Sequence, residues 1–376
     1  MRIGIDARFF GSLGKGLGRY SQKLIENLEK IDSKNQYFIF LRKDNFSEYT
    51  PVNSNFKKIL ADFKWYSFEE QISFPRLLKK YNLDLVHFPH FNIPIFYRKN
   101  FIVTIHDLIL LHFPTLRNTT LHPLWYKCKF FVYKKVIKRA LLKSKKVIAV
   151  SQFTKKDILK EFPDVPKNKI NVTYEAAENF CFFYNKSREE TFAKYGIMKP
   201  YLLYVGNAYP HKNLENLVMA FKEIKKKFPF FQLVLVGKED YFYKKLKEFV
   251  KDNNINEGII FAGFIPDNEL DLIFKEATLY VWPSLYEGFG LSPLEAMSKG
   301  TPVISSNHPC MREILENSAE YFDGQNVRDI TQKITALIVD KRRLVQLKQA
   351  GYQQVKKYDW EKMARETLDM YDSCSS

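Results

Sequence analysis

The chain has 376 residues, 45% of them hydrophobic and 16% aromatic, which predicts two globular domains of ordinary size and excludes a disordered chain. No apolar run approaches the roughly 18 residues of a membrane-spanning helix, and the charged segment 1–6 is not expected to be a signal peptide. The net charge of +17 favours an anionic partner or surface, and four scattered cysteines without metal-ligand spacing are expected to be reduced in a cytoplasmic protein.

The first half of the chain alternates short apolar runs with helical patterns. A glycine-rich loop, 11–18, follows the first run, and Tyr20, Leu24 and Leu28 mark an amphipathic helix after it. This alternation predicts a parallel sheet in an α/β domain. The predicted strands of this half are 2–5, 37–41, 85–87, 101–105 and 147–150.

The glycine-rich loop invites a second interpretation, a dinucleotide site. The spacing of Gly14, Gly16 and Gly18 is not G-x-G-x-x-G, and the second strand ends at Arg42 without an acidic residue for an NAD ribose. An NAD site is therefore not expected, while Arg42 leaves an NADP site open.

His106 and Asp107 directly follow the strand 101–105. Ligands of doubly wound sheets bind beyond the carboxyl ends of the strands, so His106 is either a functional residue or a hydrogen-bonded core histidine. The chain contains neither an Asp-x-Asp pair nor a His/Cys cluster with ligand spacing, and no metal is expected.

Residues 125–146 hold nine Lys or Arg and no acidic residue, interleaved with aromatic residues. Phe130, Tyr133, Ile137 and Leu141 recur at helical spacing, so one face can be buried. The basic face is either simply solvated or attaches to anionic lipid, at about 1 kcal/mol per basic residue. We favour the membrane surface. No nucleic acid is expected, because no zinc-finger or RNA-recognition pattern occurs.

A second α/β series begins near residue 200. Its predicted strands are 201–205, 232–236, 258–261, 279–282 and 302–304. The weakly periodic stretch 178–199 is the candidate linker, and 200–357 is the second domain. The cleft between two such domains is the default binding site.

The loop 206–213 leads into an amphipathic helix for which Asn213 can act as the N-cap. Lys212 then lies at the positive end of a helix dipole, where a cation is mildly unfavourable. A bound diphosphate would remove this conflict; the alternative is a lysine that points into water.

Two glutamates separated by seven residues, Glu287 and Glu295, flank the turn 288–290 and the start of a further helix. Ser292 has the chemistry of an N-cap and Pro293 suits the first helical position. Glu295 is therefore either a functional carboxylate or the residue that completes a capping box with Ser292. Glu287 has no such alternative duty.

Five segments, in this order along the chain, resemble the retaining glycosyltransferases of family 4, which have the GT-B fold. Bacterial members that build surface polysaccharides, many of them mannosyltransferases, are the most similar. The resemblance implies two Rossmann-like doubly wound domains that face each other across a cleft. The first, which consists of 1–177 and a returning C-terminal helix in 358–376, is expected to bind the acceptor, and the second, 200–357, the nucleotide sugar. The segments are GKGLGRY (14–20), VTIHDL (103–108), AVSQFTKKDI (149–158), VGNAYPHKNL (205–214) and EGFGLSPLEAMSKGTPVI (287–304).

The resemblance also implies roles for single residues. Lys212 is similar to the lysine that binds the diphosphate, Glu287 to the carboxylate that faces the transferred sugar, and His106 to the histidine that reaches this sugar. Glu295 resembles the residue that holds the donor ribose. The remaining donor-binding positions implied are Gly14, Gly16, Asn207, His211, Ile265, Gly288, Phe289, Gly290 and Leu291.

One position departs from the family pattern. Many members have an arginine directly after the glycine that begins the lysine loop, and Asn207 stands there in this chain. The positive charge at the diphosphate would then come from Lys212 alone, unless a protonated His211 shares it.

The implied function is transfer of a sugar, with mannose suggested by the family, from a nucleoside-diphosphate sugar to a hydroxyl of a glycan or lipid-linked glycan. Neither a cofactor nor a metal is expected, and the place of action is the cytoplasm or the inner face of the cytoplasmic membrane. Three alternatives remain: a nucleotide-sugar epimerase, a glycosyl phosphorylase of the same fold, and a non-catalytic basic binding protein.

Overall fold

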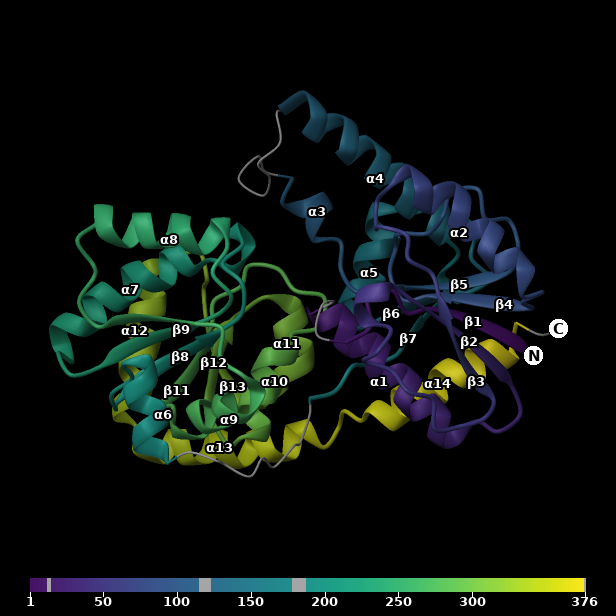
Figure 1. The fold of residues 1–376 in the computed structure, drawn as a ribbon. Helices are drawn as coiled ribbons and strands as arrows, with labels where there is room; N and C mark the ends of the chain where they lie inside the picture. Colours follow the sequence, from purple (N-terminus) through teal and green to yellow (C-terminus); the bar gives the residue numbers. More distant parts are fainter. Residues whose placement is uncertain (12–14, 115–122, 178–186, 375–376) are drawn as a thin grey trace. The chain divides into compact units, whose positions relative to one another are not determined.

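The structure is a computed structural model that describes residues 1–11, 15–114, 123–177 and 187–374 (Figure 1). Contacts divide the chain into two compact units: unit 1, Met1–Glu175 with Asp359–Ser376, and unit 2, Ala176–Tyr358. The segment 178–199, expected as a linker, contains helix α6 (Arg188–Tyr195) of unit 2, which starts with a capping box between Ser187 and Glu190.

Unit 1 is built on a seven-stranded parallel sheet with the order β3-β2-β1-β4-β5-β6-β7. Its strands are β1 (Arg2–Asp6), β2 (Gln36–Leu41), β3 (Phe56–Leu60), β4 (Leu85–Phe88), β5 (Phe101–Ile105), β6 (Val147–Ala149) and β7 (Ile170–Val172). Its helices are α1 (Lys15–Ile31), η2 (Lys43–Asn45), α2 (Phe68–Lys80), α3 (Ile109–His112), α4 (Pro123–Lys143), α5 (Gln152–Glu161), η4 (Lys167–Lys169) and α14 (Trp360–Asp372).

Helices cover both faces of the sheet of unit 1. Phe38 and Phe40 of β2 point into a core that also contains Phe74 of α2 and Ile137 of α4. On the opposite face, α14 packs beside α1, and its Tyr371 hydroxyl bonds His87 Nδ1 at 2.7 Å (Figure 1). This is the two-sided burial that parallel strands require.

Unit 2 contains a six-stranded parallel sheet with the order β10-β9-β8-β11-β12-β13. In Figure 1, α7 and α12 lie on one side of it and α10 and α13 on the other. Its strands are β8 (Tyr201–Val205), β9 (Gln232–Val236), β10 (Ile259–Gly263), β11 (Leu279–Trp282), β12 (Val303–Ser306) and β13 (Ala319–Phe322). Besides α6, its helices are η5 (Pro210–Lys212), α7 (Leu214–Lys227), α8 (Tyr241–Asp252), α9 (Asp267–Glu276), α10 (Leu291–Ser298), α11 (Pro309–Leu315), η6 (Glu316–Ser318), α12 (Val327–Val339) and α13 (Lys341–Val355).

Two doubly wound α/β units confirm the predicted fold class. The sequence missed three strands, β3, β7 and β13, and each of them lies at the edge of its sheet. An edge strand meets a neighbour on one side only and tolerates polar residues, as the lysines of β3 (FKKIL) illustrate. The apolar runs that were recognised belong mainly to fully buried central strands.

Helix α4 carries the basic segment predicted over 125–146. Ile137 and Leu141 are buried in the core, whereas Phe131 is 61% and Val132 48% exposed. The side chains of residues 123–128 lie outside the description. In the part of the chain that the structure describes, no helix has both the length and the apolar character needed to cross a membrane.

Candidate active site

The loops that follow β8 and β11 meet at the carboxyl edge of the sheet of unit 2, because these two strands are neighbours. The backbone N–H of Leu285 donates to the carbonyl of His211 at 2.8 Å, and the Ser284 hydroxyl donates to the same carbonyl at 3.2 Å. These bonds join the lysine loop to the glutamate loop, 75 residues further along the chain.

Lys212 and Glu287 form a buried ion pair. Lys212 Nζ donates to Glu287 Oε1 at 2.6 Å, and the two side chains are 11% and 9% exposed. The ammonium also lies 4.7 Å from the centroid of the Trp282 ring, a contact that the sequence did not suggest. The anion that neutralises Lys212 in this structure is therefore Glu287. Two of the predicted catalytic residues are thus in direct contact.

Asn213 occupies the N-cap position of α7, but its side chain does not cap the helix. The residue has a left-handed backbone (φ 60°), and its Nδ2 donates to the carbonyls of Pro283 at 3.1 Å and Gly324 at 2.6 Å. The expected side-chain cap is therefore wrong. The amide donates instead to carbonyls of the loops that follow β11 and β13. Asn213 therefore links these two loops to its own loop after β8.

Helix α10 begins two residues earlier than its sequence suggests. Its N-cap is Gly290 with φ 95°, and Leu291 is the first helical residue, so the predicted N-cap at Ser292 is wrong. The φ of 95° favours glycine at this position, and a Cβ there would lie 2.5 Å from Cε of Met311, the end of a flexible side chain. No capping box can therefore join Ser292 to Glu295.

Glu295 is half-buried on α10 beside Tyr280 of β11. Burial of the Tyr280 hydroxyl, with the nearby Glu295 carboxylate as the next cause, raises the pKa of Tyr280 well above its ordinary value. Tyr280 thus stays protonated and donates to the carbonyl of Val205 at 3.2 Å. The Glu295 carboxylate remains close to the strand ends, where a ribose could accept or donate hydrogen bonds.

Three neighbouring strands of unit 2, β8, β9 and β10, end in glycines: Gly206, Gly237 and Gly263. Their backbones pack against one another, since Gly237 N–H donates to Gly263 carbonyl at 3.0 Å and a Cβ on Gly237 would lie 2.1 Å from the carbonyl oxygen of Gly206. A Cβ on Gly263, in contrast, would meet nothing within 4 Å. Protein atoms thus fill the space that side chains at Gly206 and Gly237 would need, and only the backbone at Gly263 is left open to a ligand.

Other predicted donor residues contribute backbone rather than side chains to this edge. The Phe289 ring is 4% exposed and packs edge-on against Tyr358, and Ile265 is 2% exposed. Gly288 is buried in the turn before α10, and Leu291 provides the first amide of that helix. Asn207 is half-buried, and its Oδ1 accepts from the Tyr209 N–H at 3.3 Å.

His211 cannot share the positive charge of Lys212. Burial of the ring, together with the neighbouring Lys212 ammonium, lowers the pKa of His211 to about 3. The imidazole is therefore neutral near pH 7, and the expectation of a protonated His211 is wrong.

In unit 1, His106 lies at the carboxyl end of β5 and uses both ring nitrogens within that unit. Nε2 donates to the carbonyl of Pro89 at 2.9 Å, and Nδ1 lies 2.9 Å from Glu175 Oε1. Burial alone would lower the pKa of His106, but the hydrogen bond and charge of Glu175 outweigh it and raise the pKa. The alternative of a hydrogen-bonded histidine thus describes this structure, and the role toward a sugar stays a prediction.

The glycine segment after β1 differs from the expected loop. Helix α1 begins at Lys15, so Gly16 and Gly18 lie in its first turn. A Cβ on Gly18 would approach the Gly11 carbonyl oxygen to 2.1 Å, whereas one on exposed Gly16 would meet nothing within 4 Å. Close packing requires glycine at 18 rather than at 16. Gly14 lies outside the described residues.

Two further groups of side chains are relevant to the binding of a cofactor or a metal. Arg42, the residue left open for NADP, is already held by Asp44 at 3.0 Å and lies over the Trp65 ring. Within the described residues, His112, Asp157 and Glu161 place potential metal-ligand atoms within 4.8 Å of one another. His112 Nε2 bonds the Asp157 carboxylate at 2.8 Å, which accounts for this grouping without an ion.

Two family models match the chain. The model described as "Glycosyltransferase Family 4" matches residues 14–176, and the one described as "Glycosyl transferases group 1" matches residues 187–354. The chain belongs to the family 4 glycosyltransferases. As a member of this family it has the GT-B fold, with one doubly wound domain in each unit.

Similar proteins agree with this membership. The O-antigen chain mannosyltransferase RfbU of Salmonella typhimurium is 29% identical over 324 residues, which cover 83% of this glycosyltransferase and 84% of RfbU. The O-antigen chain mannosyltransferase B of Escherichia coli is 26% identical over 95% of both chains. The structure of Anabaena Alr3699/HepE in complex with UDP-glucose has the same fold, with a TM-score of 0.73, 15% identity and 99% coverage of both chains.

Proposed function

We propose that this glycosyltransferase transfers mannose, with retention at the anomeric carbon, from a nucleoside-diphosphate donor to a hydroxyl of a growing surface polysaccharide. The observation that carries the proposal is the buried Lys212–Glu287 pair beside the N-terminus of α10. A cation, helix amides and a carboxylate within one edge of a sheet match the charges of a diphosphate joined to a sugar.

In this proposal unit 2 binds the donor. The open backbone at Gly263 accommodates the flat nucleobase, and Glu295 accepts hydrogen bonds from the ribose. Negative charge builds on the departing diphosphate, where Lys212 and the amides at the start of α10 stabilise it by several kcal/mol. Glu287 then faces the transferred sugar. The proposal includes no metal, and the cation that it assigns to the departing diphosphate is Lys212.

The choice of sugar and acceptor is supported by the similar proteins. Two relatives that match most of this chain are O-antigen chain mannosyltransferases, and an O-antigen chain is a glycan. A neighbour of the same fold binds UDP-glucose, which supports a nucleotide sugar as the donor class. The acceptor is accordingly a glycan, free or attached to a lipid.

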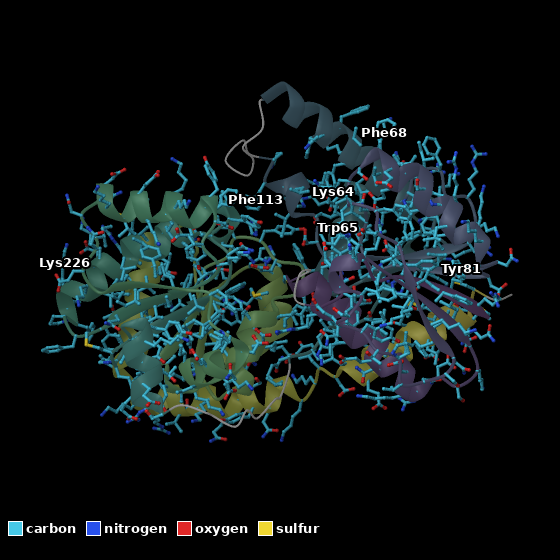
Figure 2. All side chains as sticks on the ribbon, viewed as in Figure 1. Lys64, Trp65, Phe68, Tyr81, Phe113 and Lys226 are labelled. Carbon is cyan, nitrogen blue, oxygen red and sulfur yellow. The ribbon has the colours of Figure 1, made fainter. Side chains whose placement is uncertain are left out.

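Replacing the lysine tests the function. Lys212→Ala should lower turnover at least about a hundredfold, because it removes preorganised charge at the leaving group. Lys226→Ala is the matched control, since Lys226 is 63% exposed and pairs with Glu223 at the surface of unit 2 (Figure 2). Near wild-type transfer by Lys212→Ala would refute the assignment. Conversion of the donor into an isomeric sugar without any acceptor, rather than its slow hydrolysis, would instead indicate an epimerase.

We propose in addition that α4 attaches to anionic membranes. Phe131 and Val132 are exposed beside Lys135, whose ammonium lies 5.2 Å from the centre of the Phe131 ring. Exposed apolar side chains among lysines suit the interface of an anionic bilayer. Vesicles of phosphatidylglycerol should bind the protein and vesicles of phosphatidylcholine should not. Phe131→Ser should weaken binding while Phe230→Ser, at an 84% exposed position of unit 2, should not. Equal binding to both lipids would contradict the proposal.

A further inference from the structure

Tyr66 stands out in unit 1 because a large exposed side chain is combined with a strained backbone. Its φ is 58°, in the left-handed region that bulky residues rarely adopt, and its side chain is 65% exposed. Such a conformation costs on the order of 1–3 kcal/mol and persists only where the surroundings enforce it. The Tyr66 ring is not buried, and the residue is not a glycine, so neither burial nor backbone freedom accounts for the positive φ at this position.

A buried carboxylate enforces this conformation. The backbone N–H of Tyr66 donates to Glu70 Oε2 at 2.8 Å. Glu70 is itself fully buried and accepts from Arg8 Nη2 at 2.7 Å and from Asn92 Nδ2 at 2.9 Å. Because each of these groups has its partners in the core of unit 1, the position of the Tyr66 backbone is fixed from within.

Trp65, the residue before Tyr66, is held in place by contacts of its ring. The Trp65 ring stacks on Phe9 with 4.2 Å between centroids and 3° between planes, and the Arg42 guanidinium lies 4.9 Å from its centre. In Figure 2, Trp65 and Phe68 mark the segment that carries Tyr66 into α2. Both faces of Trp65 are therefore covered by protein, while the exposed ring of Tyr66 is left for solvent or a ligand.

Aromatic and polar groups from other strand ends surround Tyr66. The rings of His90 and Phe91, which follow β4, each lie 6.5 Å from that of Tyr66, and Tyr133 of α4 packs edge-on against Phe91 at 4.8 Å. Asp107 follows β5, and its Oδ1 accepts from the N–H of Ile109 at 2.9 Å. Partial burial of the Tyr66 hydroxyl, with the Glu70 and Asp107 carboxylates as further causes, raises the pKa of Tyr66, so it remains a hydrogen-bond donor.

His90 adds a second donor. Its Nδ1 accepts from the Asn92 N–H at 3.4 Å, so the proton of the neutral ring is on Nε2. Burial and the nearby His106 lower the pKa of His90 to about 3, which keeps the ring neutral near pH 7. The cluster of Tyr66, His90 and Phe91 thus offers two uncharged donors and a set of aromatic rings.

We propose that Tyr66, His90 and Phe91 form the acceptor subsite of this glycosyltransferase and bind a neutral pyranose ring of a glycan. This inference rests on the proposed function, which leaves open how an acceptor is recognised. The exposed Tyr66 ring offers an apolar surface to the C–H groups of the sugar, and the Tyr66 hydroxyl and His90 Nε2 donate hydrogen bonds to its hydroxyls. Pockets for small ligands combine aromatic walls with a few polar groups in this way.

The groups of the cluster favour a neutral ring over an anionic one. The Tyr66 hydroxyl and the neutral His90 ring are uncharged donors, so neither supplies the positive charge that pairs strongly with a phosphate or sulfate. A neutral sugar hydroxyl, in contrast, can accept a hydrogen bond from either donor.

The Tyr66→Gly substitution tests recognition of the acceptor sugar without disturbing the fold. Glycine adopts φ 58° without strain, so this variant should melt at the wild-type temperature or above it. Loss of the ring should raise the acceptor KM at least about tenfold, with the donor KM unchanged and with unchanged slow hydrolysis of the donor when no acceptor is present. Phe68→Gly is the matched control, because Phe68 is 87% exposed two residues away on the same segment.

The substrates for this test are a GDP-mannose donor and three acceptors: mannotriose, maltotriose and a mannotriose that carries a terminal phosphate. Transfer to at least one neutral trisaccharide, lost selectively in Tyr66→Gly, supports the subsite. An unchanged acceptor KM in Tyr66→Gly, an equal loss in Phe68→Gly, or a preference for the phosphorylated acceptor overturns it. Wild-type protein that neither transfers mannose nor hydrolyses the donor would instead contradict the proposed function, so the two failures are distinguishable.

Discussion

The buried ion pair predicts that Glu287→Gln binds nucleoside diphosphates more tightly than the wild type while it transfers sugar more slowly. In the structure Glu287 holds Lys212 at 2.6 Å, so a diphosphate must compete with a carboxylate for the same ammonium. Loss of the carboxylate weakens the competitor and removes a negative charge from the site. The same substitution deprives the sugar of the group that faces it.

The size of the effect follows from the geometry of the pair. At 2.6 Å and an effective dielectric constant of about 20, the gross attraction is about 6 kcal/mol, but the net value of a hydrogen bond to a charged group is about 1.5–3 kcal/mol after desolvation. A glutamine oxygen still accepts from Lys212, with roughly half the strength. About 0.8–1.5 kcal/mol is therefore released, which corresponds to diphosphate binding about three- to tenfold tighter.

Titration calorimetry with GDP and UDP measures this affinity, and turnover with GDP-mannose, which should fall at least about a hundredfold, measures the opposing loss. Glu223→Gln is the matched control: Glu223 lies 2.7 Å from Lys226, but this pair is exposed and should change neither quantity. Equal or weaker diphosphate binding by Glu287→Gln would show that Lys212 does not exchange Glu287 for a phosphate, and would refute the reasoning.

Two further predictions concern stability. Gly290→Ala should destabilise the protein by more than about 1 kcal/mol, because alanine is strained at φ 95° and its Cβ would lie 2.5 Å from Met311 Cε; chemical denaturation should show a smaller loss for Gly263→Ala, where φ is 72° and space is open. The raised pKa of His106 contributes stability that is fully present below its ordinary value of 6.5 and is lost as pH rises through the folded value. Glu175→Gln should therefore cost more stability at about pH 6 than at about pH 9, and an equal cost at both would contradict the role of Glu175.

Much of the architecture could be predicted from the sequence because central parallel strands are buried on both faces. Runs such as 101–105 and 232–236 are buried at every position and mostly apolar, and the functional loops follow them directly. The edge strands β3, β7 and β13 lack this signal. Where each of these short strands begins and ends depends on its pairing with a neighbouring strand that is distant in sequence.

The contacts within the site were harder to foresee, because they depend on which loops meet. Asn213 has the residue type of an N-cap, yet the carbonyls of Pro283 and Gly324 bind its amide. Ser292 and Glu295 have the spacing of a capping box, yet Gly290 takes the N-cap position two residues earlier. In both cases the residue type or spacing matched a local rule that the structure does not follow.

The Lys212–Glu287 pair itself argues for function rather than stability. Removing two charges from water costs several kcal/mol per ion, and apolar residues of similar volume stabilise a fold as well or better. From its sequence, Lys212 was expected either to bind a diphosphate or to point into water. In the structure its ammonium contacts the carboxylate of Glu287 instead. A buried cation whose partner is a carboxylate can exchange it for a phosphate without ever being left unpaired. The pair therefore holds a positive charge within a buried site. A solvated lysine would not be buried, and an apolar pair would carry no charge.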